Sequence, residues 1–259
     1  MKAVILAGGT QSTISNEYEG IPKPMVEVGG RPLLWHIMQN FSRHGIHDFI
    51  ICGGYKIDVI KQYFTDYYIY ESDITVDLQT NSIQIHKKRT ENWNVSVIDT
   101  GLHSTPGKRI SLIEKYIEDD TFLVSYGDCL SNINITELFK VHKSHGKCVT
   151  FTMAKPIGRN KLLFINSNGE LQFEETVEEN NAWINADCFV FNKEVFRYVN
   201  GDFDLEEQFL IMLSKAEQLG TYYHQGYWRA METRRDLLSA ETLWKKKQAP
   251  WMCGEQYLS

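Results

Sequence analysis

The chain has 259 residues, of which 42% are hydrophobic and 23% are charged. These are the proportions of an ordinary globular protein, and they exclude a disordered, collagen-like or disulfide-dense chain. The balance of 27 basic against 33 acidic residues gives −6 overall, which argues against nucleic acid as the main partner because proteins that bind it usually carry a basic face.

No stretch approaches the roughly 20 apolar residues of a membrane span, so we expect no membrane partner. The apolar run at the N-terminus is shorter than a signal peptide needs, and a buried first strand suits it better. Five cysteines without CxxC spacing argue against zinc and against a disulfide framework, which predicts a cytoplasmic protein.

Strand and helix signals alternate along the chain. Apolar runs or alternation predict strands at residues 3–6, 49–52, 74–78, 83–85, 95–98, 122–126, 149–153, 162–165, 170–174 and 188–191. One-sided apolar spacing predicts helices at residues 33–41, 56–64, 109–117, 135–145, 205–219 and 233–247. Strand, helix and strand with glycine-marked turns is typical of right-handed parallel βαβ units. We therefore predict an α/β fold with a Rossmann-like, mixed, mostly parallel sheet flanked by helices, into which residues 74–85 insert a β-hairpin.

Two predicted strand ends carry residues suited to chemistry. Gly8-Gly9 follow the first strand, where missing side chains let backbone N–H groups approach a phosphate. Asp128 follows the strand at residues 122–126, where a carboxylate could hold a hard cation. Lys23 stands between two prolines, a setting suited to a polyphosphate. Taken singly, these features also fit a tight turn, a helix cap and a surface lysine.

Together these segments resemble the sugar-1-phosphate nucleotidylyltransferase family, and within it the branch that joins CTP to glucose 1-phosphate. The resemblance rests on MKAVILAGG, IPKPMVEVGGRPLLWHIM, FIICGGY, KKRTENWNVSVIDTG, YGD, GYWRAMETRRD and KKKQAPW, which occur in family order over nearly the whole chain. It implies one nucleotidyltransferase-like domain over residues 1–259. Residues 1–154 would form the nucleotide-binding half, and residues 155–259 the acceptor-binding half with the C-terminal helices.

The resemblance also implies the reaction and its residues. An acceptor phosphate attacks the α-phosphorus of CTP and pyrophosphate leaves, while Mg²⁺ and basic side chains offset the charge. The implied nucleotide-binding residues are Leu6, Ala7, Gly8, Gly9, Thr100, Gly101, Gly107 and Asp128. The implied phosphate-contacting and catalytic residues are Lys23 and Arg109, and the implied metal ligands are Asp128 and Glu232. Relatives of this kind form oligomers, so we expect a homo-oligomer.

Several positions depart from the family pattern. Thr13 replaces the arginine of the first loop, which reads GGxGTRL in the family, and Glu232 replaces the aspartate of its MDT motif. We hypothesise that Arg229 or Arg234, where relatives carry uncharged residues, supplies the lost charge as a catalytic group; both also fit a helix-start surface. The acceptor side departs too, and its expected residues are Glu174, Glu175, Thr176, Asn185 and Asp187. Here Thr176 replaces the lysine of an EKP motif. Asp187 stands where the family has a glycine that admits a hexose; the alternative is that Asp187 is only a surface substitution.

These departures predict an enzyme, a CTP-dependent cytidylyltransferase, whose acceptor is a small phosphate monoester or acyl phosphate other than glucose 1-phosphate. Phosphorylated glutamine, associated with capsule decoration, is one such acceptor, because its amide or ammonium group would give Asp187 a partner. Two alternatives stay open: CDP-glucose synthesis, and a nucleotide-binding regulatory subunit without catalysis.

Overall fold

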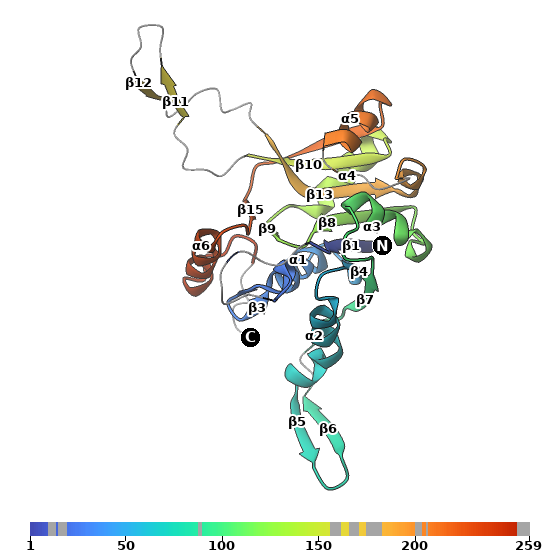
Figure 1. The fold of residues 1–259 in the computed structure, drawn as a ribbon, viewed down its shortest axis with the longest axis vertical. Helices are drawn as coiled ribbons and strands as arrows, with labels where there is room; N and C mark the ends of the chain where they lie inside the picture. Colours follow the sequence, from blue (N-terminus) through green and yellow to red (C-terminus); the bar gives the residue numbers. More distant parts are fainter. Residues whose placement is uncertain are drawn as a thin grey trace.

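The computed structural model describes residues 1–9, 14, 20–87, 90–155, 162–165, 171–174, 183–199, 204–205 and 207–252. A seven-stranded sheet crosses the molecule in the order β14-β10-β13-β8-β1-β4-β7 (Figure 1). In chain order these strands are β1 (Lys2–Ala7), β4 (Asp48–Gly53), β7 (Asn94–Asp99), β8 (Thr121–Tyr126), β10 (Val149–Ala154), β13 (Ile184–Asn192) and β14 (Leu219–His224). Neighbouring strands run parallel except at β13, which is antiparallel to both β8 and β10. The predicted mixed, mostly parallel sheet is confirmed.

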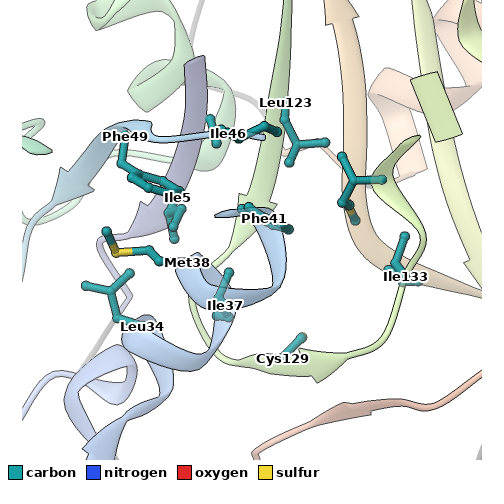
Figure 2. Packing of buried hydrophobic residues seen from close by; sticks show 14 of the residues in the cluster. Ile5, Leu34, Ile37, Met38, Phe41, Ile46, Phe49, Leu123, Cys129 and Ile133 are labelled. Carbon is teal, nitrogen blue, oxygen red and sulfur yellow. The ribbon is translucent and has the colours of Figure 1, made fainter. Parts of the chain in front are cut away.

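Both faces of the sheet are buried, because side chains alternate along each strand. On β1, Ala3 and Ile5 pack toward α1 (Leu33–Ser42), α2 (Ile57–Tyr70) and α4 (Ile135–His145), whereas Val4 and Leu6 pack toward α3 (Pro106–Leu112) and α5 (Glu207–Lys215). Figure 2 shows the first of these cores, where side chains from α1 meet those from β1, β4 and β8. The two cores hold the central strands, and therefore their carboxyl ends, in fixed positions.

A third apolar cluster lies beside the sheet and joins the chain's C-terminal part to its N-terminal part. The helix α6 (Arg234–Lys245) begins with a capping box between Thr233 and Asp236. It packs on the short strand β2 (Glu27–Val28), which pairs with β3 (Arg31–Pro32). Trp251, almost fully buried, completes this cluster. The segment that carries Lys23 is thus anchored between α1 and the C-terminal region.

The predicted inserted hairpin is present. β5 (Asp73–Asp77) and β6 (Ser82–Lys87) pair antiparallel and extend from the end of α2 away from the sheet (Figure 1). A second antiparallel pair is formed by β11 (Leu162–Ile165) and β12 (Leu171–Glu174). Among the described residues, no helix is both long and apolar enough to cross a membrane.

The structure differs from the sequence prediction at several elements. The helix predicted at residues 205–219 is present as α5, but its predicted end is wrong. α5 ends at Lys215, Glu217 adopts a left-handed φ of 57°, and the strand β14 then joins the sheet edge. The helix predicted at residues 109–117 begins earlier, at Pro106, and divides into α3 and a 3₁₀ turn at Glu114–Tyr116. The strands β9 (Cys129–Ser131) and β15 (Trp228–Ala230), which pair with each other, were not predicted.

Candidate active site

A cavity of about 460 Å³ opens beyond the carboxyl ends of β1, β7 and β8. Ligands of open α/β sheets bind at this edge. The residues that line the cavity are Leu6, Gly8, Gly9, Lys23, Pro24, Leu102, His103, Ser104, Pro106, Arg109, Tyr126, Gly127 and Asp128. Six of the residues expected from the sequence therefore meet in one place: Leu6, Gly8, Gly9, Lys23, Arg109 and Asp128.

The glycines of the first loop have different surroundings. Gly8 is buried, and a Cβ at this position would overlap the guanidinium of Arg109. Gly9 is exposed, and nothing would lie within 4 Å of a Cβ built there. Only Gly8 is therefore required for packing, whereas Gly9 leaves open space beside the backbone at the cavity wall.

Arg109 ties together the strand ends that surround the cavity. Its side chain is 3% exposed and donates hydrogen bonds to the carbonyl oxygens of Gly8, Gly53 and Gly101. It also donates to the Thr100 hydroxyl, at 2.7 Å. Burial lowers its pKa from the usual value, yet a guanidinium stays charged at neutral pH. Arg109 thus braces the ends of β1, β4 and β7 and also forms part of the cavity wall.

Lys23 and Asp128 form an ion pair at the cavity. Lys23 begins the 3₁₀ turn η2 (Lys23–Met25), where Pro22 and Pro24 fix the backbone on either side. Its Nζ lies 2.9 Å from Asp128 Oδ2, and both side chains are about three-quarters shielded from solvent. Partial burial opposes the charged lysine, but attraction to Asp128 and Glu232 outweighs it and raises the pKa of Lys23.

The short β9–β15 ladder brings a second carboxylate to this pair. Ala230 pairs with Cys129, and the Met231 N–H donates to the Asp128 carbonyl oxygen at 2.9 Å. Glu232 follows directly and is exposed. Its charge acts on Lys23, so one ammonium group lies within the field of two carboxylates.

The donor set at this point fits a hard divalent cation. Two carboxylates suit Mg²⁺, which usually takes one or two protein carboxylates and completes its octahedron with phosphate oxygens and water. Over the described part of the chain, no group of three or more His, Cys, Asp or Glu side chains could hold a metal ion by itself. A cation here would therefore depend on a bound polyphosphate for its other ligands.

Asp187, on β13, lies near Asp128. Its backbone is in the left-handed region with a φ of 54°, and its N–H donates to Asn185 Oδ1 at 3.1 Å. The Cys129 thiol lies 3.4 Å from Asp187 Oδ2 and 3.6 Å from Asp128 Oδ1. Burial and the two carboxylates raise the pKa of Cys129 well above its usual value, so the thiol stays protonated and can donate. Asp187 is thus linked to Asp128 through one buried thiol.

Arg229 is positioned by the same ladder but is held by a different acid. It lies on β15, and its Nε donates to Asp236 Oδ1 at 3.0 Å. Asp236 also belongs to the capping box of α6. Burial alone would raise the pKa of Asp236, but the hydrogen bonds from Thr233 and the charge of Arg229 outweigh burial and lower this pKa. Arg229 does not line the cavity, so its expected catalytic role stays a prediction.

The other expected residues lie at varying distances from the cavity. Ala7 packs in the core on the α1 side of the sheet. Thr100 and Gly101 contact Arg109, and Gly107 is buried in α3. Glu174 ends β12, and its side chain is not described. Glu175 and Thr176, like Thr13, lie outside the described residues.

Sequence reasoning missed the part of the cavity wall that follows β7. Leu102, His103, Ser104 and Pro106 line the cavity there. The signal that could have found them is positional, since they lie at the carboxyl end of a parallel strand, where the first glycine loop also lies. Their residue types alone, which include Leu, Ser and Pro, indicate no particular chemistry.

Comparison with known proteins places the chain among nucleotidyl transferases. The family model described as "Nucleotidyl transferase" matches residues 2–246. A glucose-1-phosphate cytidylyltransferase of Salmonella typhimurium is 43% identical over 257 residues, covering 98% of this chain and 100% of that protein. A mannose-1-phosphate guanyltransferase of Candida albicans is 24% identical and is covered over 69% of its length. The crystal structure of HddC from Yersinia pseudotuberculosis complexed with GMP-PN superposes with a TM-score of 0.65 at 21% identity, covering 93% of this chain and 98% of that one, which supports the fold.

Proposed function

The chain belongs to the nucleotidyl transferase family, and on that premise we propose that it transfers a cytidylyl group from CTP to the phosphate of a small acceptor, with release of pyrophosphate. The observation that carries this proposal is the Lys23–Asp128 ion pair at the cavity beyond β1 and β8. The choice of CTP is supported by the 43% identity to a glucose-1-phosphate cytidylyltransferase.

In the proposed reaction, an oxygen of the acceptor phosphate attacks the α-phosphorus of CTP. A new P–O bond forms there, and the bond between the α-phosphorus and the bridging β-oxygen breaks, so that pyrophosphate leaves with the electron pair. Catalysis of this kind is mostly positioning and charge stabilisation. The Lys23 ammonium, kept charged by its carboxylate neighbours, offsets the charge that accumulates on the phosphate oxygens. The open space at Gly9 admits phosphate to the backbone.

Asp128 and Glu232 are the residues that would hold Mg²⁺. When bound, the ion would neutralise phosphate charge and orient the triphosphate. Asp128 already pairs with Lys23 through Oδ2, so this carboxylate would share its charge between the ammonium and the ion. Glu232 is exposed and can turn toward a triphosphate.

Glucose 1-phosphate is the acceptor that the relatives favour. The similarity to the Salmonella typhimurium enzyme extends over 98% of this chain, which includes both the half expected to bind the nucleotide and the half expected to bind the acceptor. We therefore rank glucose 1-phosphate, the acceptor for CDP-glucose synthesis, ahead of the other small phosphates that the departures from the family pattern predicted.

A second candidate acceptor is favoured by one observation, the left-handed Asp187. Holding a residue other than glycine in this conformation costs about 1–2 kcal/mol, although aspartate tolerates it better than most. Such outliers cluster at functional sites. A carboxylate linked to Asp128 through Cys129 would favour an acceptor with an ammonium or amide group, such as phosphorylated glutamine, over a polyhydroxyl sugar.

One assay separates these acceptors. The protein is incubated with CTP and Mg²⁺ and with glucose 1-phosphate, phosphorylated glutamine or other phosphate esters, and pyrophosphate and the CDP-linked product are measured. Product with glucose 1-phosphate supports the first candidate, and product confined to an amino-bearing phosphate supports the second. Tight CTP binding without product from any acceptor would indicate a non-catalytic regulatory subunit instead.

We also propose that the protein acts in the cytoplasm as a homo-oligomer. The four cysteines described, Cys52, Cys129, Cys148 and Cys188, are free and buried, as a reducing compartment favours. A reducing agent should therefore leave the thermal midpoint unchanged, and a large shift would argue against this compartment.

A further inference from the structure

Cys129 lies between two carboxylates, one that follows β8 and one on β13. It is the first residue of β9 and is 7% exposed, at the margin of the core on the α1 side of the sheet (Figure 2). Its Sγ lies 3.4 Å from Asp187 Oδ2 and 3.6 Å from Asp128 Oδ1. A thiol carries one proton, so it donates to only one of these carboxylates at a time. The two carboxylates therefore compete for a single weak donor.

The other oxygen of Asp128 has a donor of a different kind. Its Oδ2 accepts from the Lys23 ammonium at 2.9 Å, so each of the two oxygens has its own partner. A carboxylate held through both oxygens cannot rotate about its Cβ–Cγ bond without losing one of these contacts. Cys129 thus helps to fix the direction in which Asp128 presents its oxygens to a cation.

A bulge in β13 brings Asp187 to the thiol. Over one stretch β10 advances by two residues while β13 advances by four, so β13 bulges between Asn185 and Phe189. Bulges redirect side chains, and the left-handed φ of 54° at Asp187 belongs to this one. Trp228 Nε1 anchors the bulge by donating to the Ala186 carbonyl oxygen at 2.8 Å. Since β15, which carries this tryptophan, also pairs with β9, one small ladder positions both the thiol and the Asp187 carboxylate.

We propose that Cys129 is a positioning residue for nucleotidyl transfer, whose shared proton orients Asp128 and links the cation side of the site to Asp187. The inference rests on the proposed function, in which Asp128 would hold Mg²⁺. Loss of a side chain that orients a metal ligand typically lowers metal affinity or activity about ten- to a hundredfold. Because a thiol is a weak donor, we expect about tenfold here. An acceptor group that donates to Asp187, such as a hydroxyl or an ammonium, would release the proton to Asp128.

The choice of substitutions separates the thiol proton from the packing of the side chain. Cys129→Val fills a similar space without a donor, and Cys129→Ser keeps a donor. Cys129→Ala is less suitable, because Cys129 lines a cavity of about 10 Å³ that would enlarge and admit a water as a substitute donor. Cys148→Val is the matched control, since Cys148 is also buried and precedes β10 at the edge of the sheet opposite the cavity.

The first test measures CTP affinity by calorimetry with and without Mg²⁺, and compares the ratio of the two affinities. Circular dichroism checks that each variant is folded. We expect Cys129→Val to lower this ratio about tenfold, whereas Cys129→Ser and Cys148→Val stay close to the wild type. An unchanged ratio in folded Cys129→Val, or an equal fall in Cys129→Ser or in Cys148→Val, would overturn the proposal.

The second test uses no nucleotide, so it separates this inference from the proposed function. The S–H stretching band of Cys129 is obtained as the difference between the infrared spectra of the wild type and Cys129→Ser. We expect the frequency of a hydrogen-bonded thiol, and a shift of the band in Asp187→Asn, because an amide oxygen attracts the proton less than a carboxylate does. Asparagine tolerates the left-handed backbone at this position.

A band at the frequency of an unbonded thiol, or one that does not respond to Asp187→Asn, would overturn the shared proton and with it the proposal. Absence of CTP binding in the wild type, together with the expected band, would count against the proposed function and leave the shared proton in place.

Discussion

The Nζ of Lys23 lies 2.9 Å from Oδ2 of Asp128, although the two residues are 105 positions apart in the chain. Prolines on both sides fix the lysine backbone, and Asp128 lies two residues beyond the end of the central strand β8. The pair therefore places a lysine ammonium, which its carboxylate neighbours keep protonated, in the wall of a cavity lined by a glycine loop. This arrangement suits the binding of an anion whose charge increases during a reaction.

Gly8→Ala should destabilise the protein, because the added methyl would overlap the Arg109 guanidinium, which is buried and bound to backbone carbonyl oxygens. Overpacking of this kind typically costs about 1–3 kcal/mol. Thermal unfolding measures the change in free energy, and CTP calorimetry shows whether the cavity survives. Gly9→Ala is the matched control, since nothing lies within 4 Å of its Cβ position. If both substitutions lower the free energy of unfolding equally, then contact with the Arg109 guanidinium is not the reason that position 8 requires a glycine.

Glu232→Gln should weaken the effect of Mg²⁺ on CTP binding, because it removes one of the two carboxylates near Lys23 while keeping the side chain's size. Calorimetry with and without Mg²⁺ measures this effect as the ratio of the two CTP affinities. Glu118→Gln, whose side chain is 88% exposed, is the control. If the ratio of the two CTP affinities is the same in Glu232→Gln as in the wild type, Glu232 is not a ligand of the metal.

Arg229→Ala should lower turnover more than Arg235→Ala. Arg229 lies on the strand that pairs with β9, directly after Asp128, whereas Arg235 is exposed on α6. Loss of one charge-assisted contact to phosphate costs about 1.5–3 kcal/mol, or roughly ten- to a hundredfold in rate. Steady-state pyrophosphate release provides the comparison. Equal turnover in the two variants would show that Arg229 serves only to hold Asp236.

Acid should destabilise the protein through His36. Its Nε2 lies 2.8 Å from the Val28 carbonyl oxygen, and its Nδ1 lies 3.3 Å from Trp251 Nε1, so the neutral ring donates on one side and accepts on the other. Burial lowers the pKa of His36 from 6.5 to about 4. The unfolded chain therefore binds the proton more readily, and the stabilisation present above pH 6.5 is lost as the pH falls toward 4.

The expected loss over that range is about 3 kcal/mol. It is measured by chemical denaturation at pH 7 and at pH 4, where His36→Gln should show a smaller difference between the two pH values than the wild type. The exposed His47→Gln should behave like the wild type. A pH dependence that is the same in all three proteins would contradict this role of His36.

The sequence predicted the central sheet and the meeting of Lys23 with Asp128 for identifiable reasons. The buried strands β1, β4 and β8 are short apolar runs that end at a glycine or just before one, and a parallel sheet gathers such ends at one edge. Lys23 was singled out by its setting between Pro22 and Pro24, which also fits a surface lysine, and the family resemblance then implied that it contacts phosphate.

Other features depend on contacts that no local pattern contains. The partners of Arg109 are backbone carbonyl oxygens at the ends of three strands, which any residue type could supply. β9 and β15 are three residues each, too short for alternation to show, yet they bring Glu232 to Lys23. Likewise, β14 follows α5 without a glycine or proline between them, so the apolar residues of both fit one continuous helix in the sequence.

The most direct test of the account is the rate of pyrophosphate release from CTP, Mg²⁺ and glucose 1-phosphate by the wild type, Lys23→Met and the control Lys143→Met, which changes an exposed lysine on α4. We predict that Lys23→Met keeps its fold but has a turnover rate about ten- to a hundredfold lower than the wild type, whereas the control retains the wild-type rate. A folded Lys23→Met protein that releases pyrophosphate as fast as the wild type would contradict the claim that the Lys23–Asp128 pair acts on the triphosphate.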